Sequence, residues 1–182
     1  MSTSNLVLIT GYAGSGKDEV GKILQENAYK RYAFADLVKI HTADKHGFSI
    51  DLTKTQEGKN TIVKSRYNQQ DATVRQFLID ESALMKEEFD EPAFWAILLE
   101  KQIKDEPPHN IIITDWRYEA ELNHMLKEFT DCRIIKIRIQ RNSVKPLEDP
   151  SEHNIDHIVC DYTIENNGSL EELRRQVTLL PL

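Results

Sequence analysis

The chain contains little cysteine and no long apolar run. Its 2 cysteines, Cys132 and Cys160, lie far apart and have no metal-ligand spacing, so we expect reduced thiols rather than a disulfide framework or a zinc site. The stretch Leu6–Ile9 is far too short to span a membrane, and Met1–Asn5 lacks the basic region of a secretory signal. We therefore expect a cytoplasmic protein with no membrane partner.

An excess of basic residues is also missing. The formal net charge is -7 and the isoelectric point is near 5.4, which argues against a general nucleic-acid-binding surface but leaves room for a locally basic cleft that binds a small anion. No internal repeat, low-complexity tract or flexible linker divides the 182 residues. This length suits one domain with a substantial core, so residues 1–182 are predicted to form a single domain.

A glycine-rich motif directly follows the apolar segment Leu6–Thr10. It reads Gly11, Tyr12, Ala13, Gly14, Ser15, Gly16, Lys17 and Asp18. The three glycines allow positive φ and bring backbone amides close to an anion, and Lys17 adds a mobile cation. The following residues have helical periodicity, so a helix N-terminus would point its positive dipole at the same anion. Strand, loop and helix in this order predict binding of a nucleoside triphosphate.

The motif fits GxxxxGK[ST] except at Asp18, where a hydroxyl residue is usual. A carboxylate there would bind magnesium directly or through water. The alternative is that the glycine-rich segment is only a turn between strand and helix.

Apolar runs alternate with helical patterns along the chain, as in a doubly wound α/β domain with a five-stranded parallel sheet and helices on both faces. The predicted strands are Leu6–Thr10, Tyr29–Phe34, Ile111–Thr114, Arg133–Ile139 and Asp161–Glu165. The predicted helices are Ser15–Asn27, Asp36–Ala43, Ala72–Glu88, Pro92–Lys104, Tyr118–Phe129 and Ser169–Leu179. Ligands of such sheets bind at the carboxyl ends of the strands, so residues just after each strand carry most of the functional information.

Asp115 and Arg117 follow the third predicted strand. Asp115 is placed where an acid can hold magnesium beside phosphates, and its alternative role is a helix N-cap. Arg117 can bind a phosphate with two parallel hydrogen bonds, and its alternative is a salt bridge to Glu119 or Glu121.

Three further arginines are candidates for phosphate binding. Arg138 and Arg141 lie at the end of the fourth predicted strand and lead into a polar segment that suits a lid, about 140–156. The alternative is a solvated charged loop. Arg75 opens a helix, where it opposes the dipole, so either binding of a second phosphate or surface placement explains it.

Several segments together resemble one enzyme family. They are the loop ending in Gly16-Lys17-Asp18, Phe34–Lys39, Arg75–Leu78, Asp115–Glu121, Ser151-Glu152 with Asp156, and Asp161–Leu170. In these segments the chain resembles the deoxynucleoside monophosphate kinases of viruses, particularly bacteriophages, which have the P-loop kinase fold. It is similar in part to the animal-type phosphomevalonate kinases. For a viral protein the compartment would be the host cytoplasm.

The resemblance implies magnesium-dependent transfer of the γ-phosphate of ATP to a (deoxy)nucleoside monophosphate. ATP would be held by Gly11–Asp18, Asn166 and Gly168, and catalysis would involve Lys17, Arg117, Arg138 and Arg141. The acceptor-binding region would be about 36–90, and the metal would be held by Asp18 and Asp115. The acceptor would be held by Lys39, Arg75 and Arg117, together with Asp36 of the same segment as Lys39. The stretch 41–70 matches no segment of the family, and its candidates for acceptor binding, taken from the residues alone, are Lys64, Arg66 and Tyr67.

Two other functions stay open. The first is a phosphomevalonate kinase, which has the same acceptor chemistry with a different acceptor. The second is a noncatalytic ATP-binding regulatory protein, which the unusual Asp18 keeps in consideration. Small nucleotides are the expected partners, and a homodimer is expected because dimers are common among soluble proteins. Neither the base nor the sugar of the acceptor follows from the residues.

Overall fold

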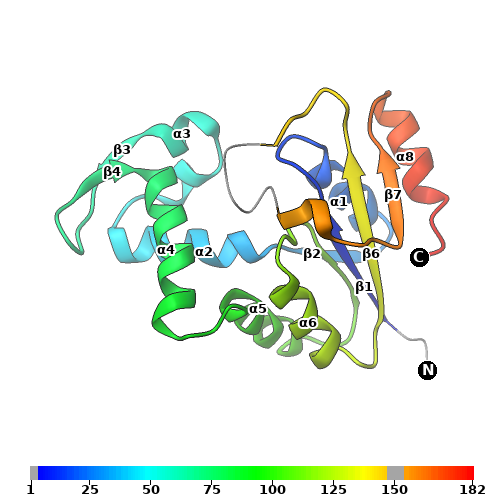
Figure 1. The fold of residues 1–182 in the computed structure, drawn as a ribbon, viewed down its shortest axis with the longest axis horizontal. Coiled ribbons are helices and arrows are strands. Elements are labelled where there is room, and N and C mark those ends of the chain that lie inside the picture. Colours follow the sequence, from blue (N-terminus) through cyan, green and yellow to red (C-terminus); the bar gives the residue numbers. More distant parts are fainter. Residues whose placement is uncertain (1–3, 147–153) are drawn as a thin grey trace. The chain divides into compact units, whose positions relative to one another are not determined.

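The computed structural model describes residues 4–146 and 154–182, which form two compact units (Figure 1). Unit 1 comprises Met1–Ala33 and Leu99–Leu182, and unit 2 comprises Phe34–Leu98. Unit 2 contains the range, about 36–90, in which acceptor binding is expected. Within the described ranges, no helix combines the length and the apolar character needed to cross a membrane.

Unit 1 is built on a five-stranded sheet in the order β2-β5-β1-β6-β7, and every pairing in it is parallel. Its strands are β1 Asn5–Thr10, β2 Tyr29–Tyr32, β5 Asn110–Ile113, β6 Arg133–Gln140 and β7 Tyr162–Glu165. β1 is central and almost fully buried, and Thr10 at its end is in register with Arg138 of β6. This register aligns the ends of β1 and β6 at the carboxyl edge of the sheet.

Helices cover both faces of this sheet. They are α1 Lys17–Gln25, α6 Glu119–Glu128 and α8 Leu170–Thr178, with a short 3-10 helix, η2, at Ile155–His157. A further helix, α5 Phe94–Lys104, begins in unit 2 and belongs to unit 1 from Leu99 onward. Buried side chains of α1 and α8 form one apolar cluster with the sheet. Ser169 caps α8, since its hydroxyl accepts a hydrogen bond from the Glu172 amide at 3.2 Å.

Unit 2 is made of helices and a short hairpin. Its elements are α2 Phe34–His46, η1 Ile50–Thr53, α3 Gln56–Asn60, β3 Ile62–Lys64, β4 Asp71–Thr73 and α4 Val74–Glu88. β3 and β4 pair antiparallel, and the Thr73 side chain caps α4 by accepting from the Gln76 amide. α2 packs against α4 within the unit.

The predicted fold class, an α/β domain with a five-stranded parallel sheet and helices on both faces, is confirmed. The boundaries differ in places. α2 continues to His46 rather than Ala43, and α5 begins at Phe94 after a turn that contains Pro92. The stretch 41–70, which has no clear apolar periodicity, contains α3 and β3.

Candidate active site

The glycine-rich motif forms the turn between β1 and α1. Gly11, Gly14 and Gly16 have φ values of 147°, 80° and 106°, which confirms the prediction of positive φ. Gly16 is the N-cap of α1, adopts a left-handed conformation and provides no capping side chain. The positive end of α1 therefore begins at the loop itself, as anion binding at a helix N-terminus requires.

Close approach of neighbouring atoms also requires glycine in this loop. A Cβ at Gly11 would lie 2.4 Å from the Ile139 carbonyl oxygen, which belongs to the backbone of β6. A Cβ at Gly16 would lie 2.2 Å from Nδ2 of Asn166. Both distances are far below van der Waals contact, so the loop packs tightly against the ends of β6 and β7.

Lys17 is the first residue of α1 and is half-buried. Its Nζ donates to the carbonyl oxygens of Gly11 at 2.6 Å and Tyr12 at 2.8 Å. The ammonium group thus lies over the loop, and a phosphate held by the loop would be within its reach. Thr10 directly precedes the motif and Ser15 lies within it. Their hydroxyl oxygens are buried and have no hydrogen-bond partner among the described residues. Unsatisfied buried polar atoms are uncommon and concentrate at functional sites.

Two adjacent asparagines directly after β7 form hydrogen bonds to the phosphate loop, to the end of β6 and to the segment after it. Asn166 donates from Nδ2 to the Ser15 carbonyl at 2.8 Å, and its own amide donates to the Gln140 carbonyl at 2.8 Å. Asn167 accepts from the Asn142 amide through Oδ1 at 2.7 Å. The asparagines therefore fix the phosphate loop and the segment after β6 to one strand end.

A cavity of about 420 Å³ lies beside this junction. Its lining combines the loop and first turn of α1 with Arg141, Asn166, Gly168 and two leucines of α8. The structure thus brings together residues that the sequence analysis assigned to ATP binding, namely Gly14, Gly16, Lys17, Asp18, Asn166 and Gly168. Their role in binding ATP stays a prediction.

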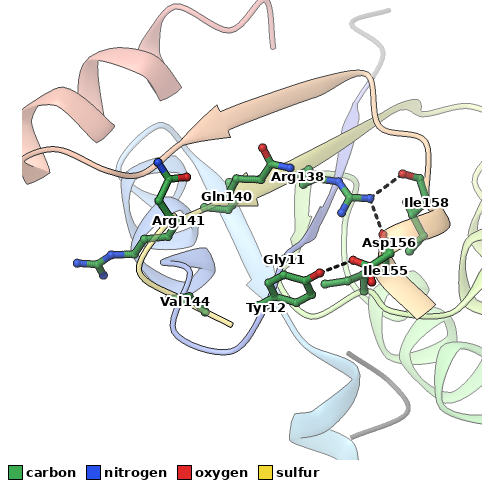
Figure 2. A pocket seen from close by; sticks show the side chains of 11 residues that line it. Gly11, Tyr12, Arg138, Gln140, Arg141, Val144, Ile155, Asp156 and Ile158 are labelled. Atoms are coloured by element: carbon green, nitrogen blue, oxygen red, sulfur yellow. Dashed lines mark hydrogen bonds between the residues drawn. The ribbon is translucent and has the colours of Figure 1, made fainter. Parts of the chain in front are cut away.

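A second cavity, of about 590 Å³, lies between the loop and the segment around η2 (Figure 2). Gly11 and Tyr12 line it together with Arg138, Arg141 and Asp156. The Tyr12 hydroxyl donates to Asp156 Oδ1, which links the phosphate loop to η2. The sequence did not predict this hydrogen bond, because Tyr12 and Asp156 are distant in the chain and belong to no shared motif.

Arg138 and Arg141 have different surroundings. Arg138 is half-buried on β6, and its Nη2 donates to the carbonyl oxygens of Ile155 and, at 2.7 Å, Ile158. Arg141 is exposed and its side chain points away from these carbonyls (Figure 2). The polar segment assigned to a lid, about 140–156, is described only in part, since Glu148, Asp149 and Glu152 lie outside the described residues.

The segment Asp115–Tyr118 leaves β5 next to the end of β1. The buried Trp116 anchors it, because its amide donates to the Ile9 carbonyl at 3.2 Å and its indole Nε1 donates to the Tyr118 carbonyl at 2.9 Å. α6 begins at Glu119 with Tyr118 as its N-cap, so the alternative that Asp115 is the N-cap is wrong. Glu121 Oε2 accepts from the amides of Arg117 and Tyr118, both at 3.1 Å.

The two predicted magnesium ligands lie on different segments of unit 1. The Asp18 side chain is 83% exposed at the first turn of α1, and Asp115 is half-buried after β5. Within the described parts of the chain, no cluster of three or more acidic, histidine or cysteine side chains could hold a metal. Magnesium is compatible with this arrangement, because it is commonly held by one or two carboxylates together with substrate phosphates and water. Both assignments stay predictions.

The predicted acceptor residues other than Arg117 lie in unit 2 and have local partners. Lys39 Nζ lies 2.7 Å from Asp36 Oδ1, one turn earlier on α2. Arg66 donates to the backbone carbonyl and, at 3.2 Å, to the carboxylate of Asp44. Arg75, in the first turn of α4, donates to Gln56 Oε1 of α3 at 2.6 Å.

Comparisons with known proteins identify the fold of this chain but assign it to no family. No protein-family model matches the chain, and no curated protein matches its sequence. A dephospho-CoA kinase from Campylobacter jejuni is similar in structure with a TM-score of 0.52, 17% identity, and coverage of 96% of this chain and 94% of that one. The protein TT1252 from Thermus thermophilus is similar with a TM-score of 0.52, 14% identity and coverage of 97% and 96%. An APS kinase of Mycobacterium tuberculosis gives a TM-score of 0.48, 13% identity and coverage of 98% and 96%.

The similarity to the dephospho-CoA kinase, with a TM-score of 0.52, shows that this chain has the P-loop kinase fold. At such low identity the likeness concerns the fold alone. The function has to be argued from the geometry of the site.

Proposed function

We propose that this protein transfers the γ-phosphoryl group of ATP, with magnesium, to the phosphate of a (deoxy)nucleoside monophosphate. The observation that carries the proposal is the phosphate loop. Three glycines have positive φ, α1 begins at Lys17 with Gly16 as an N-cap that has no side chain, and the Lys17 ammonium donates to two loop carbonyls. This combination suits the β- and γ-phosphates of a nucleoside triphosphate. The kinase neighbour from Campylobacter jejuni is compatible with this chemistry.

On this proposal, each charged group has a task at the transferring phosphoryl group. Loop amides and Lys17 bind the ATP phosphates, while Arg117 and Arg141 neutralise charge that develops during transfer. Arg138 contributes by holding the backbone at Ile155 and Ile158. Asp18 and Asp115 would hold magnesium, which would supply further charge neutralisation. Each well-placed cation is worth about 100-fold or more in rate.

Because the proposed acceptor group is a phosphate, the transfer needs no general base. Phosphate oxygens are nucleophilic at neutral pH, whereas an alcohol needs its proton removed. Lys39, Arg66 and Arg75 are the basic residues of unit 2 assigned to the acceptor, together with Asp36. Catalysis would then rest on in-line positioning and on charge, which are the main contributions in phosphoryl transfer.

The test is ADP release from magnesium-ATP with a panel of all ribo- and deoxyribonucleoside monophosphates and mevalonate phosphate. Release with one or a few nucleotides supports the proposal and identifies the base and the sugar. Release with mevalonate phosphate alone would replace the proposal by a phosphomevalonate kinase. Measurable ATP binding without acceptor-dependent release would favour a noncatalytic nucleotide-binding protein.

The variant Lys17→Ala tests the role of the phosphate loop in the transfer. We expect transfer to be abolished with the fold intact, because Lys17 interacts with carbonyls of a surface loop. Lys22→Ala, an exposed position of the same helix, is the control and should keep full activity. Turnover retained by Lys17→Ala would defeat the assignment of the loop.

A further inference from the structure

A buried polar network in unit 2 is not used by the proposed chemistry. Ser65, His46 and Glu81 are 0%, 3% and 4% exposed. His46 Nδ1 lies 2.8 Å from Ser65 Oγ, and His46 Nε2 lies 3.0 Å from Glu81 Oε1. The Phe77 ring stacks on the imidazole with centroids 4.1 Å apart. The network thus joins the end of α2, the loop after β3 and the middle of α4.

Counting donors and acceptors assigns the tautomer of His46. The Ser65 hydroxyl accepts from the amides of Tyr67 at 3.1 Å and Asn68 at 3.4 Å, which uses both of its lone pairs. Its one proton is then donated to His46 Nδ1. The imidazole proton therefore lies on Nε2 and is donated to Glu81, so His46 is in the Nε2–H form.

This network holds the turn Ser65–Gln70, which connects β3 and β4. The Arg66 amide donates to the His46 carbonyl at 2.9 Å, so both the backbone and the side chain of His46 contact the turn. Within the turn, the Ser65 amide donates to the Gln70 carbonyl at 2.8 Å, and Gln69 has a φ of 60°. A non-glycine residue at positive φ costs free energy, so external contacts are needed to keep this conformation.

Glu81 is connected to the same turn by a second route. Lys45 Nζ lies 2.8 Å from Glu81 Oε1 and 4.7 Å from the ring centroid of Tyr67. His41 Nε2 lies 3.1 Å from Glu81 Oε2. Burial acts to raise the pKa of Glu81, but hydrogen bonds from Lys45 and His46 outweigh it and hold this pKa below its ordinary value. The carboxylate therefore stays charged and keeps Lys45 beneath the tyrosine ring.

Tyr67 is the residue that this arrangement presents to solvent. The residue is 68% exposed. Its amide nevertheless donates to Ser65 Oγ, Lys45 Nζ lies over one face of its ring, and the His46 imidazole contacts the ring edge-on. An exposed aromatic ring that is already immobilised loses little entropy on binding a planar partner. Nucleobases stack on such rings largely without regard to sequence.

We infer that Tyr67 is a stacking surface for the nucleobase of the acceptor and that His46 is the positioning residue that holds it there. The inference rests on the proposed function, because it assigns the acceptor's base a place in unit 2. His46 acts through the turn and does not touch the acceptor. The phosphate of the acceptor would be bound by other residues, so losing Tyr67 should weaken acceptor binding without affecting ATP.

The first measurement is nitrogen-15 NMR of the histidine side chains in the unmodified protein. We expect His46 to show the shifts of an Nε2–H tautomer. An Nδ1–H pattern would overturn the network as described. This measurement needs no acceptor and no variant, so it stands even if the proposed function fails.

The second measurement is steady-state kinetics of two variants with matched controls. In Tyr67→Ala and in Ser65→Ala we expect the KM for the nucleoside monophosphate to rise about 10-fold, since losing one stacking contact or buried hydrogen bond is worth about that factor. The KM for ATP should change less than about twofold. Phe89→Ala, another exposed aromatic of unit 2, and Thr42→Val, a buried hydroxyl that bonds to the Val38 carbonyl, are the controls.

The outcomes separate the two proposals. If no nucleoside monophosphate supports turnover by the unmodified protein, the proposed function fails. If turnover occurs and Tyr67→Ala keeps the acceptor KM of the unmodified protein, the stacking surface is refuted. An equal rise in the acceptor KM for Ser65→Ala and Thr42→Val would show that His46 and Ser65 serve only the stability of the unit. Should Ser65→Ala fail to fold, Tyr67→Ala and the NMR spectrum still decide the question.

Discussion

Arg138 and Arg141 both lie near the end of β6, but among the residues that the structure describes only Arg138 donates to backbone carbonyls, those of Ile155 and Ile158. We expect Arg138→Ala to lower the free energy of unfolding by about 2 kcal/mol, the scale of hydrogen bonds to a charged group. Arg141→Ala, at an exposed position, should change it by less than about 0.5 kcal/mol. Urea unfolding measures both. Equal stability of the two variants would contradict the structural role of Arg138.

Gly16 combines a left-handed backbone with a close neighbour. We expect Gly16→Ala to cost at least about 1–2 kcal/mol of stability, because an alanine Cβ is disfavoured at this φ and would meet Asn166. Gly168→Ala is the matched comparison, since its Cβ would meet only the flexible end of Glu172. Thermal unfolding of both variants checks the order, and a smaller loss at Gly16 than at Gly168 would refute this account of the loop.

Single residues also show what the sequence could predict about the site. The phosphate loop was predictable because all of its parts, the glycines, the lysine and the start of the helix, follow one another directly in the chain. The roles of Tyr12, Asn167 and Arg138 were not, because each depends on a partner from a distant segment. Arg138 in particular has the same residue type as Arg141, and only the carbonyl groups around it distinguish the two.

At the scale of elements, Glu81 joins α4 to α2 through His41, Lys45 and His46. Its pKa is below the ordinary value of 4.5 in the folded protein. A lowered folded pKa means that the stabilisation is fully present above about pH 4.5 and is lost as the pH falls through the folded value. At neutral pH, Glu81→Gln should cost about 3 kcal/mol, because it leaves Lys45 without its buried partner.

Chemical unfolding as a function of pH tests this account. The difference in stability between the unmodified protein and Glu81→Gln should shrink steadily as the pH falls below about 4.5. Glu87→Gln, an exposed position on the same helix, should show only a small difference at every pH. If the difference in stability between the unmodified protein and Glu81→Gln stays constant down to the pH of acid unfolding, the charge of the Glu81 carboxylate does not cause it.

The elements of unit 1 follow from sequence patterns, and those of unit 2 follow only in part. β1 is a largely apolar run, β6 combines four isoleucines with basic and polar residues, and their connecting helices have clear periodicity. The hairpin of β3 and β4 pairs only Ile62–Lys64 with Asp71–Thr73, and these residues are exposed or half-buried. Strands of this length bury too little apolar surface to leave a periodic signal. The hairpin is defined instead by the contacts of its turn with His46, which are not local.

At the scale of the whole molecule, the division into two compact units corresponds to two proposed ligands. The phosphate loop and both cavities beside it lie in unit 1, and the residues assigned to the acceptor other than Arg117 lie in unit 2. Strand order could not be predicted from the chain, because β1 pairs with β5 and β6 rather than with β2. The carboxyl-edge position of the loop was predictable, since it requires only that the strands be parallel.

Hydrogen exchange can assign each ligand to its unit. A ligand that binds only the folded state at 100 times its dissociation constant stabilises that state by about 2.7 kcal/mol. We expect a nonhydrolysable ATP analogue with magnesium to slow exchange first in the phosphate loop and α1. The accepted nucleoside monophosphate should slow it in Phe34–Leu98, including the turn Ser65–Gln70. Protection confined to unit 1 with both ligands would contradict acceptor binding by unit 2, while leaving ATP binding at the loop intact.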